Sequence, residues 1–170
     1  MIPIQINRHL VPGRYTVDEV FRGLEDSPGM KLLMPKKSDR ESILSSTYIL
    51  IVAEDMYMWT DDEDGHVNVG LEYLMKGEEV YLYLDILHEL VHVRQFKEGK
   101  ELFDRSYKYV DRPTEVEAYD YVVHEARRLG LSDEKIYDYL QVEWITKRQH
   151  DKLAKRLGVR VAQGEPSKGG

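Results

Sequence analysis

The chain has 170 residues, a hydrophobic fraction of 42%, no cysteine and a formal net charge of −7. This composition predicts one globular domain, excludes disulfide bonds and thiolate metal ligands, and argues against nucleic-acid binding. The lack of cysteine fits a reducing cytoplasm, and the longest apolar run, residues 48–53, is too short to cross a membrane. We therefore expect a cytoplasmic protein without a membrane span.

The N-terminal quarter is predicted to hold a short strand, a helix and a loop. Residues 1–6 alternate loosely, as a strand does, and Thr16 with Glu19 forms the sequence pattern of a capping box. The helix that begins there is expected to end at about Glu25, before the Ser-Pro-Gly of residues 27–29. Residues 34–42 are polar and are expected to form a loop.

A β-hairpin is predicted next. Residues 48–52 are apolar and β-branched enough for a buried strand, which residues 56–59 are expected to extend. The Asp-Gly pair at residues 64–65 is a turn signal, and residues 67–71 alternate like a returning strand. The acidic residues before the turn partly resemble a calcium loop. Thr60 and Leu71 occupy the places of its first and last carboxylates, so a solvated turn is the favoured interpretation.

The rest of the chain is predicted to be helical. The expected helices span residues 78–98, 114–129, a short segment capped by Ser132, and residues 144–157, with Gly99 and Gly130 ending the first two. Residues 1–163 are taken as a single domain and residues 164–170 as a disordered tail.

Residues 88–92 read His-Glu-Leu-Val-His, which matches the zinc-hydrolase signature H-E-x-x-H. Residues four apart lie about 40° apart around a helix, so both imidazoles can reach one metal ion. Glu89 is close enough to act on a water molecule without being a ligand. His88 and His92 are therefore candidate metal ligands, and Glu89 is the candidate catalytic base.

The helix that carries this motif is apolar over most of its circumference, which predicts that it is buried. Its polar residues fall within a sector of about 120°. They are Tyr81, Asp85, His88, Glu89, His92 and Gln95. Such a stripe is costly against packed side chains, so it favours a cleft that holds a metal ion and water over a metal-free hydrogen-bond network.

A catalytic zinc site needs a third protein ligand. A third histidine six residues after His92 is absent, because Glu98 stands there. Two glutamates on the next helix are alternatives. Glu115 falls in the middle of the apolar face, where a carboxylate is costly unless a cation compensates it, whereas Glu117 falls on the polar face. We prefer Glu115.

The H-E-x-x-H of residues 88–92, followed by the Glu-Val-Glu-Ala of residues 115–118, resembles the gluzincin clan of zinc metallopeptidases. Size and the absence of spans make the chain most similar to the minigluzincins, which are soluble minimal versions of membrane-peptidase catalytic domains. The resemblance covers residues 48–129. It implies an α+β, minimal zincin-like domain, in which a small mixed sheet packs on an active-site helix and a Glu helix, with further C-terminal helices.

The resemblance also implies peptidase chemistry with one zinc ion per chain, held by His88, His92 and Glu115. One residue departs from the pattern. Many relatives carry, four residues after the ligand Glu, an Asp that orients a metal-bound His, and here that residue is Tyr119. A phenol bonds an imidazole less strongly than a carboxylate does, so Asp85 or Gln95 could supply this support instead.

The expected activity is hydrolysis of a peptide or protein substrate, with Glu89 as general base. Candidate donors to the developing oxyanion are Tyr107, Tyr109, Tyr119 and His124, among which the sequence does not choose. Residues 66–71, or another strand before the motif helix, would pair with the substrate backbone. The alternatives are a non-catalytic or regulatory zinc protein and a hydrolase of another amide.

The C-terminal helix is basic. Its cationic residues are Lys147, Arg148, Lys152, Lys155, Arg156 and Arg160. An ordinary packed helix with a basic outer face is the favoured interpretation. The alternative is a segment that lies over the acidic body and inhibits the site, since a latent, self-inhibited form would fit the minigluzincin resemblance.

Overall fold

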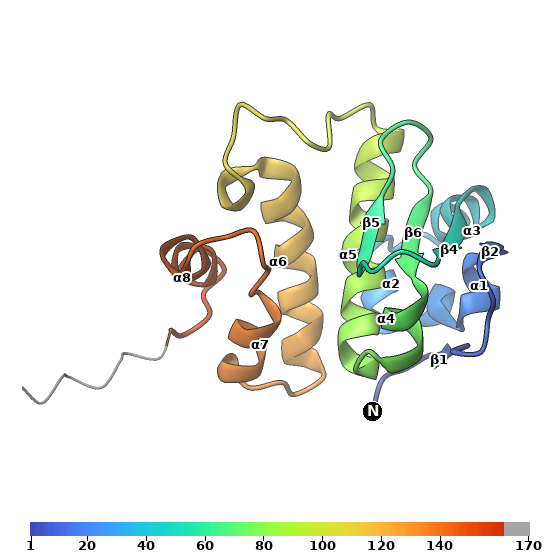
Figure 1. Cartoon of the computed structure of the whole chain (residues 1–170), viewed down its shortest axis with the longest axis horizontal. Coiled ribbons are helices and arrows are strands. Elements are labelled where there is room, and N and C mark those ends of the chain that lie inside the picture. Colours follow the sequence, from blue (N-terminus) through green and yellow to red (C-terminus); the bar gives the residue numbers. More distant parts are fainter. Residues whose placement is uncertain (162–170) are drawn as a thin grey trace, which may run out of the picture.

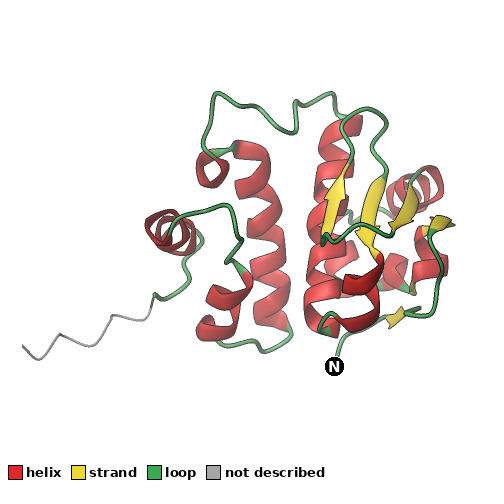
Figure 2. Cartoon of the chain, in the orientation of Figure 1, coloured by secondary structure: helices red, strands yellow, loops and turns green. Residues whose placement is uncertain are grey.

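The computed structural model describes residues 1–161, in which helices pack against a small mixed sheet (Figure 1, Figure 2). The strands are β1 (Gln5–Ile6), β2 (Gly13–Thr16), β3 (Phe21–Arg22), β4 (Tyr48–Val52), β5 (Met58–Thr60) and β6 (Val67–Gly70). The α-helices are α1 (Val17–Val20), α2 (Pro28–Leu33), α3 (Lys37–Ser46), α4 (Leu71–Lys76), α5 (Glu79–Lys97), α6 (Pro113–Arg128), α7 (Asp133–Tyr139) and α8 (Lys147–Arg156). Two 3-10 turns, η1 (Leu24–Asp26) and η2 (Tyr109–Asp111), complete them. The predicted α+β class is confirmed.

The main sheet has the strand order β2-β4-β6-β5. Strands β4 and β6 are parallel, with Ile49 opposite Val67, while β2 and β5 run antiparallel to their neighbours. The hairpin turn between β5 and β6 lies at Gly65, whose φ of 81° is readily adopted by glycine. Strand β5 is therefore an edge of the sheet.

Helix α5 is the centre of the structure. It packs against α6 along one side and against β5 of the sheet on another, and α2 also contacts it (Figure 1). Its apolar residues Leu82, Leu84, Ile86 and Leu90 have no exposed surface. A helix that is apolar almost all round must be enclosed in this way, because each apolar face needs a packing partner. This enclosure fixes where the polar stripe of α5 can open.

The later helices were predicted closely. Helices α5 and α6 begin and end within about two residues of the expected positions, and glycines with positive φ, Gly99 and Gly130, follow them. The Ser132 side chain caps α7 by accepting a hydrogen bond from the backbone N–H of Lys135. These elements carry strong local signals, which explains why sequence patterns found them.

The first helix is shorter than predicted. The capping box of Thr16 and Glu19 is present, but α1 ends at Val20. Ser27 does not follow an α-helix but the 3-10 turn η1. It is the N-cap of α2, with Pro28 as the first helical residue, where proline is well tolerated. A Ser-Pro pair can begin a helix or follow one. Here it begins α2, and this helix buries Met30.

Four further predictions need correction. The segment after α2 is the helix α3 and not a loop, and it is anchored by Arg40, whose guanidinium donates to two backbone carbonyls, and by buried Ile43. Residues 56–59 do not extend β4, because β5 lies at the far edge of the sheet. Strand β1 covers only the last two residues of the expected segment. Helix α8 begins after the capping box of Thr146 and excludes Trp144.

One continuous hydrophobic cluster runs from Ile4 to Val159. No helix among residues 1–161 combines the length and apolar composition that a bilayer crossing requires. The expected tail, residues 164–170, lies outside the described residues.

Candidate metal centre

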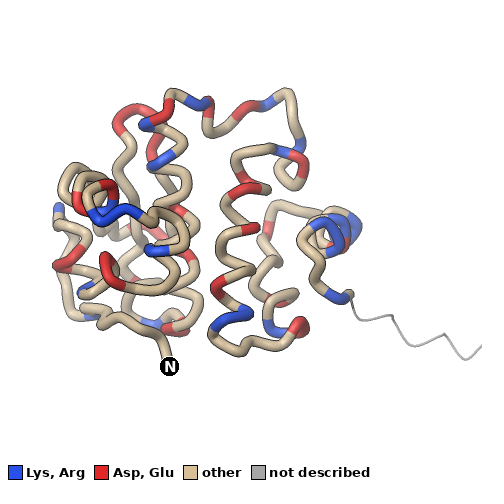
Figure 3. Tube along the Cα trace, turned by 180° about the vertical axis from the view of Figure 1, so that it is seen from behind, with Lys and Arg blue, Asp and Glu red and all other residues tan. Residues whose placement is uncertain are grey.

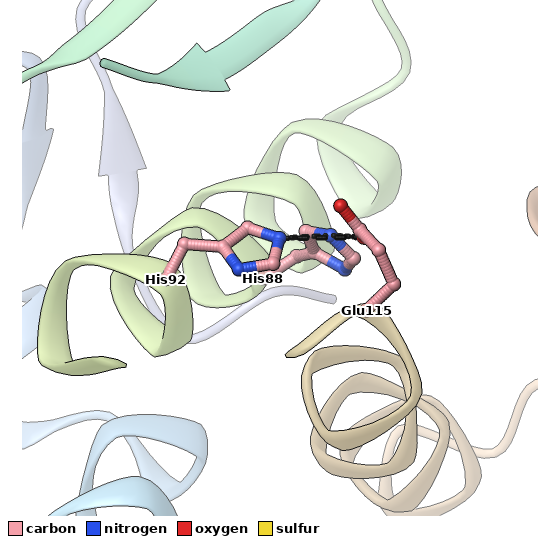
Figure 4. A group of neighbouring side chains, drawn as sticks. All are labelled: His88, His92 and Glu115. Carbon is pink, nitrogen blue, oxygen red and sulfur yellow. Dashed lines mark hydrogen bonds and ion pairs between the residues drawn. The ribbon is translucent and has the colours of Figure 1, made fainter. Parts of the chain in front are cut away.

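Three predicted ligands meet between α5 and α6. The Nε2 atoms of His88 and His92 lie 3.1 Å apart, and Oε2 of Glu115 lies 3.1 Å from the first and 3.3 Å from the second. Figure 4 shows both imidazoles of α5 pointing toward the carboxylate on α6. These three side chains, all of them buried, form a group that could hold a metal ion.

Local structure explains this convergence. One helical turn separates the two histidines, so their rings project from the same face of α5. Pro113 begins α6, which places Glu115 in the first turn, where the partial positive charge of a helix N-terminus favours a carboxylate. The close packing of α5 on α6 then brings the three side chains together. The preference for Glu115 over Glu117 agrees with this arrangement, because Glu117 pairs with Arg94 at 3.1 Å and is partly exposed.

The three side chains shift one another's pKa values. Desolvation opposes the charged form of His92, but the Glu115 carboxylate outweighs it and raises the pKa of His92 to about 9. Desolvation also opposes the charge on Glu115, yet the neighbouring imidazoles hold its pKa well below the usual range. Protonated imidazole thus balances the buried carboxylate, and a metal ion would replace that proton.

Without metal, the protein is expected to lose stability between pH 6.5 and about 9. The pKa of His92 is raised from 6.5 to about 9, so its contribution is complete below pH 6.5 and is lost as pH rises to about 9. The pKa of Glu115 is lowered, so the stabilisation that it contributes is present above the ordinary pKa of a glutamate and is lost as the pH falls. Metal binding needs neutral imidazoles, so stabilisation by metal should grow over the same interval.

Thermal unfolding of chelator-treated and zinc-supplemented protein across this pH range measures both effects. A metal-induced increase in Tm that stays constant with pH would contradict the proton-for-metal exchange.

Gln95 supports one ligand directly. Its Oε1 accepts a hydrogen bond from Nδ1 of His92 at 2.8 Å, and its Nε2 donates to the carbonyl of Thr114 and to Glu117, both at 3.0 Å. It therefore links α5 to α6 and fixes the tautomer in which Nε2 of His92 is free to bind metal. Of the two residues that the sequence offered for this support, Gln95 supplies it.

The other histidine has no such support. Nδ1 of His88 is buried and lacks a hydrogen-bond partner within residues 1–161. Tyr119 lies beside this ring, with centroids 4.4 Å apart, but its hydroxyl bonds to that of Tyr109 at 2.7 Å. Tyr119 thus packs on His88 and does not replace the orienting Asp of the resembled family.

Gln95→Leu is expected to weaken metal binding about 10- to 100-fold, because the substitution removes the hydrogen bond that orients His92 while leaving all three ligands. Competition with a chromogenic chelator measures the change. Arg94→Lys is a matched control on the same helix that keeps a cation beside Glu117. An unchanged affinity in Gln95→Leu would show that packing alone orients His92.

Glu89 lies beside the ligand group but outside it. Its side chain is buried, and the hydroxyl of Thr60 donates to Oε2 at 2.7 Å. Desolvation raises the pKa of Glu89, while the imidazoles of His92 and His88 oppose this increase. Sequence reasoning missed Thr60 as a partner, because only the sheet topology places β5 against the middle of α5.

A cavity of about 550 Å³ opens beside the metal centre. Most of the predicted polar stripe lines it, including Tyr81, Asp85 and Glu89, and β5 and residues 141–144 form other walls. The stripe therefore faces a cleft, as its pattern predicted. Gln95 is the exception, since it lies behind His92 and is fully buried.

Only some of the residues that were expected to contact a substrate lie at the cavity. Tyr109 and Tyr119 line the cavity, whereas Tyr107 and His124 do not and are exposed at the surface. Strand β6 is interior to the sheet, so it has no free edge, and the edge strand that lines the cavity is β5. Of the two alternatives expected for the pairing edge, residues 66–71 are excluded because β5 covers that side, and β5 is the other strand before the motif helix.

The acidic turn holds a second group of possible ligand atoms, from Asp61, Asp64 and His66. Asp61 accepts from the backbone N–H of Glu63, and Asp64 accepts from the backbone N–H of His66 and from the hydroxyl of Tyr48. These bonds are those of a polar turn that closes a hairpin. They agree with the favoured interpretation of a solvated turn.

Helix α8 is amphipathic, with Leu153 and Ala154 buried and cations on its outer side (Figure 3). Lys152 and Arg156 pair with Asp111 of η2 at 2.6 and 3.3 Å. These contacts are those of a packed helix with a basic outer face. None of the six cations named above lines the cavity, which borders instead on residues 141–144.

Comparison with known proteins finds no similar protein family, no similar curated protein and no similar solved structure.

Proposed function

We propose that this protein is a zinc-dependent metallopeptidase of minigluzincin type. The observation that carries this proposal is the meeting of His88, His92 and Glu115 at one point, with Glu89 beside them at the wall of a cavity. Two imidazoles and one carboxylate are a ligand set of catalytic zinc sites, which use three protein ligands, whereas structural sites use four.

The spacing of the ligand atoms is compatible with a small tetrahedral ion such as zinc. Tetrahedral ligands at about 2.0–2.1 Å from an ion lie about 3.3 Å from one another. The three distances here are 3.1, 3.1 and 3.3 Å. When bound, zinc supplies a Lewis acid that polarises a carbonyl group and makes water more acidic.

Glu89 would accept the proton of the attacking water and pass it to the leaving amine. Thr60 holds the carboxylate in place from β5, and burial raises the pKa of Glu89, which makes it a better base. Tyr109 and Tyr119 are the candidate donors to the oxyanion, since burial raises both pKa values well above the ordinary range and keeps the phenols protonated.

A peptide in the cavity could pair with the free edge of β5. Extended peptides bind to sheet edges through backbone hydrogen bonds. Trp59 of this strand is exposed and lines the cavity. The substrate class we propose is therefore an extended peptide or an unfolded segment of a protein.

Incubation of zinc-loaded protein with a mixture of synthetic peptides, read by mass spectrometry, tests the proposal. We expect new fragments that disappear with a chelator and return with zinc. Full zinc occupancy without cleavage would favour the alternative, a non-catalytic or regulatory zinc protein on the same fold.

A further inference from the structure

One end of the cavity is built around Asp85. This residue lies on the polar stripe of α5 one turn before His88, and its side chain opens to the cavity. The hydroxyl of Tyr139 donates to Oδ1 at 2.7 Å and that of Tyr73 donates to Oδ2. A carboxylate has about four acceptor positions, so about two are free for another donor.

Two further aromatic rings pack on the two tyrosines that hold this carboxylate. Tyr57 meets Tyr73 edge-on with centroids 5.0 Å apart, and Tyr81 meets Tyr139 at 5.3 Å. All four rings line the cavity. Aromatic faces attract cations within about 6 Å, and the attraction is strongest where water is excluded.

Asp85 lacks a cation of its own. It forms no ion pair with any residue of the described part of the chain, and both its donors are neutral phenols. Lys135 lies over the ring of Tyr81, but its ammonium group pairs with Glu78 at 2.9 Å. Burial raises the pKa of the Asp85 carboxyl, although both phenols and the nearby His88 imidazole oppose this, so a bound cation would stabilise the charged form.

We infer that Asp85 with Tyr73, Tyr81 and Tyr139 forms a subsite for a cationic group of the substrate. The group is an ammonium or guanidinium ion, from a Lys or Arg side chain or from a free α-amino group. This inference rests on the proposed function for its substrate class. Asp85 precedes His88 by three residues, a helix rise of about 4.5 Å, so this subsite lies close to the metal centre.

Equilibrium binding separates this inference from catalysis. The test uses zinc-supplemented Glu89→Gln protein, which is expected to bind peptides without cutting them, and isothermal titration calorimetry. Three peptides of one length are compared: a doubly blocked peptide with a central Lys, its counterpart with Met, and the Met peptide with a free N-terminus. We expect the Lys peptide, or the one with a free amine, to bind at least tenfold more tightly than the blocked Met peptide.

Asp85→Asn in the same background is expected to abolish this preference while leaving the affinity for the blocked Met peptide within about threefold. Asp138→Asn is the matched control, because Asp138 also lines the cavity but is exposed. It should keep the preference. Equal affinities for all three peptides in Glu89→Gln would overturn the inference, and so would a preference that survives in Asp85→Asn.

The comparison among peptides does not depend on how well Asp85→Asn folds. Failure of the proposed function would look different, as wild-type protein that cuts no peptide. In that case a preference for cationic peptides in binding would still support the subsite. Conversely, cleavage of peptides without any such preference would leave the peptidase proposal intact.

Discussion

Glu115→Gln is expected to abolish stoichiometric metal binding, with a loss in affinity of more than about 100-fold. Removing a residue that only orients a ligand costs 10- to 100-fold, so removing a charged ligand costs more. The amide keeps the size of the side chain but not its charge, and it leaves two imidazoles that hold metal weakly. Metal titration with a competing chelator measures the loss.

Glu117→Gln is the matched control, since it lies two residues away on α6 and keeps a partly exposed position beside Arg94. It should bind metal within a few-fold of wild type. The reverse result, loss in Glu117→Gln with retention in Glu115→Gln, would contradict the ligand assignment.

Glu89→Gln is expected to keep full metal occupancy and to lose peptide hydrolysis by a factor of about 10² to 10⁴, the contribution of a positioned general base. The side chain does not belong to the ligand group, and the amide can still bond to Thr60, so the fold and the metal should persist. The measurement pairs metal content with cleavage of a peptide found in the mixture.

Glu79→Gln is the control for this variant, because Glu79 lies at the exposed start of the same helix. Its activity should match that of wild type. Retention of hydrolysis in Glu89→Gln would show that another group accepts the proton, and loss of metal would show that Glu89 holds the ion.

Much of the site was predictable because it depends on helical periodicity. The spacing of His88 and His92 and the place of Glu115 on an apolar face follow from angles around single helices. That these two helices pack side by side came from the resemblance and not from periodicity. The role of Gln95 followed from its place on the same stripe.

Other features depend on which segments meet in space. Thr60 reaches Glu89 only because β5 crosses α5, and the sequence near Thr60 carries no sign of it. Asp85 was visible as part of the stripe, but its tyrosine neighbours come from α4 and α7. In the N-terminal third, short elements such as α1 are decided by burial more than by local propensity, so their lengths were mispredicted.

The metal content of protein purified without added metal tests the central claim most directly. We expect about one zinc per chain by elemental mass spectrometry, and none in Glu115→Gln. Protein that contains no zinc and takes up none on titration would contradict the account. The buried group of His88, His92 and Glu115 would then be a hydrogen-bonded ion pair within the core.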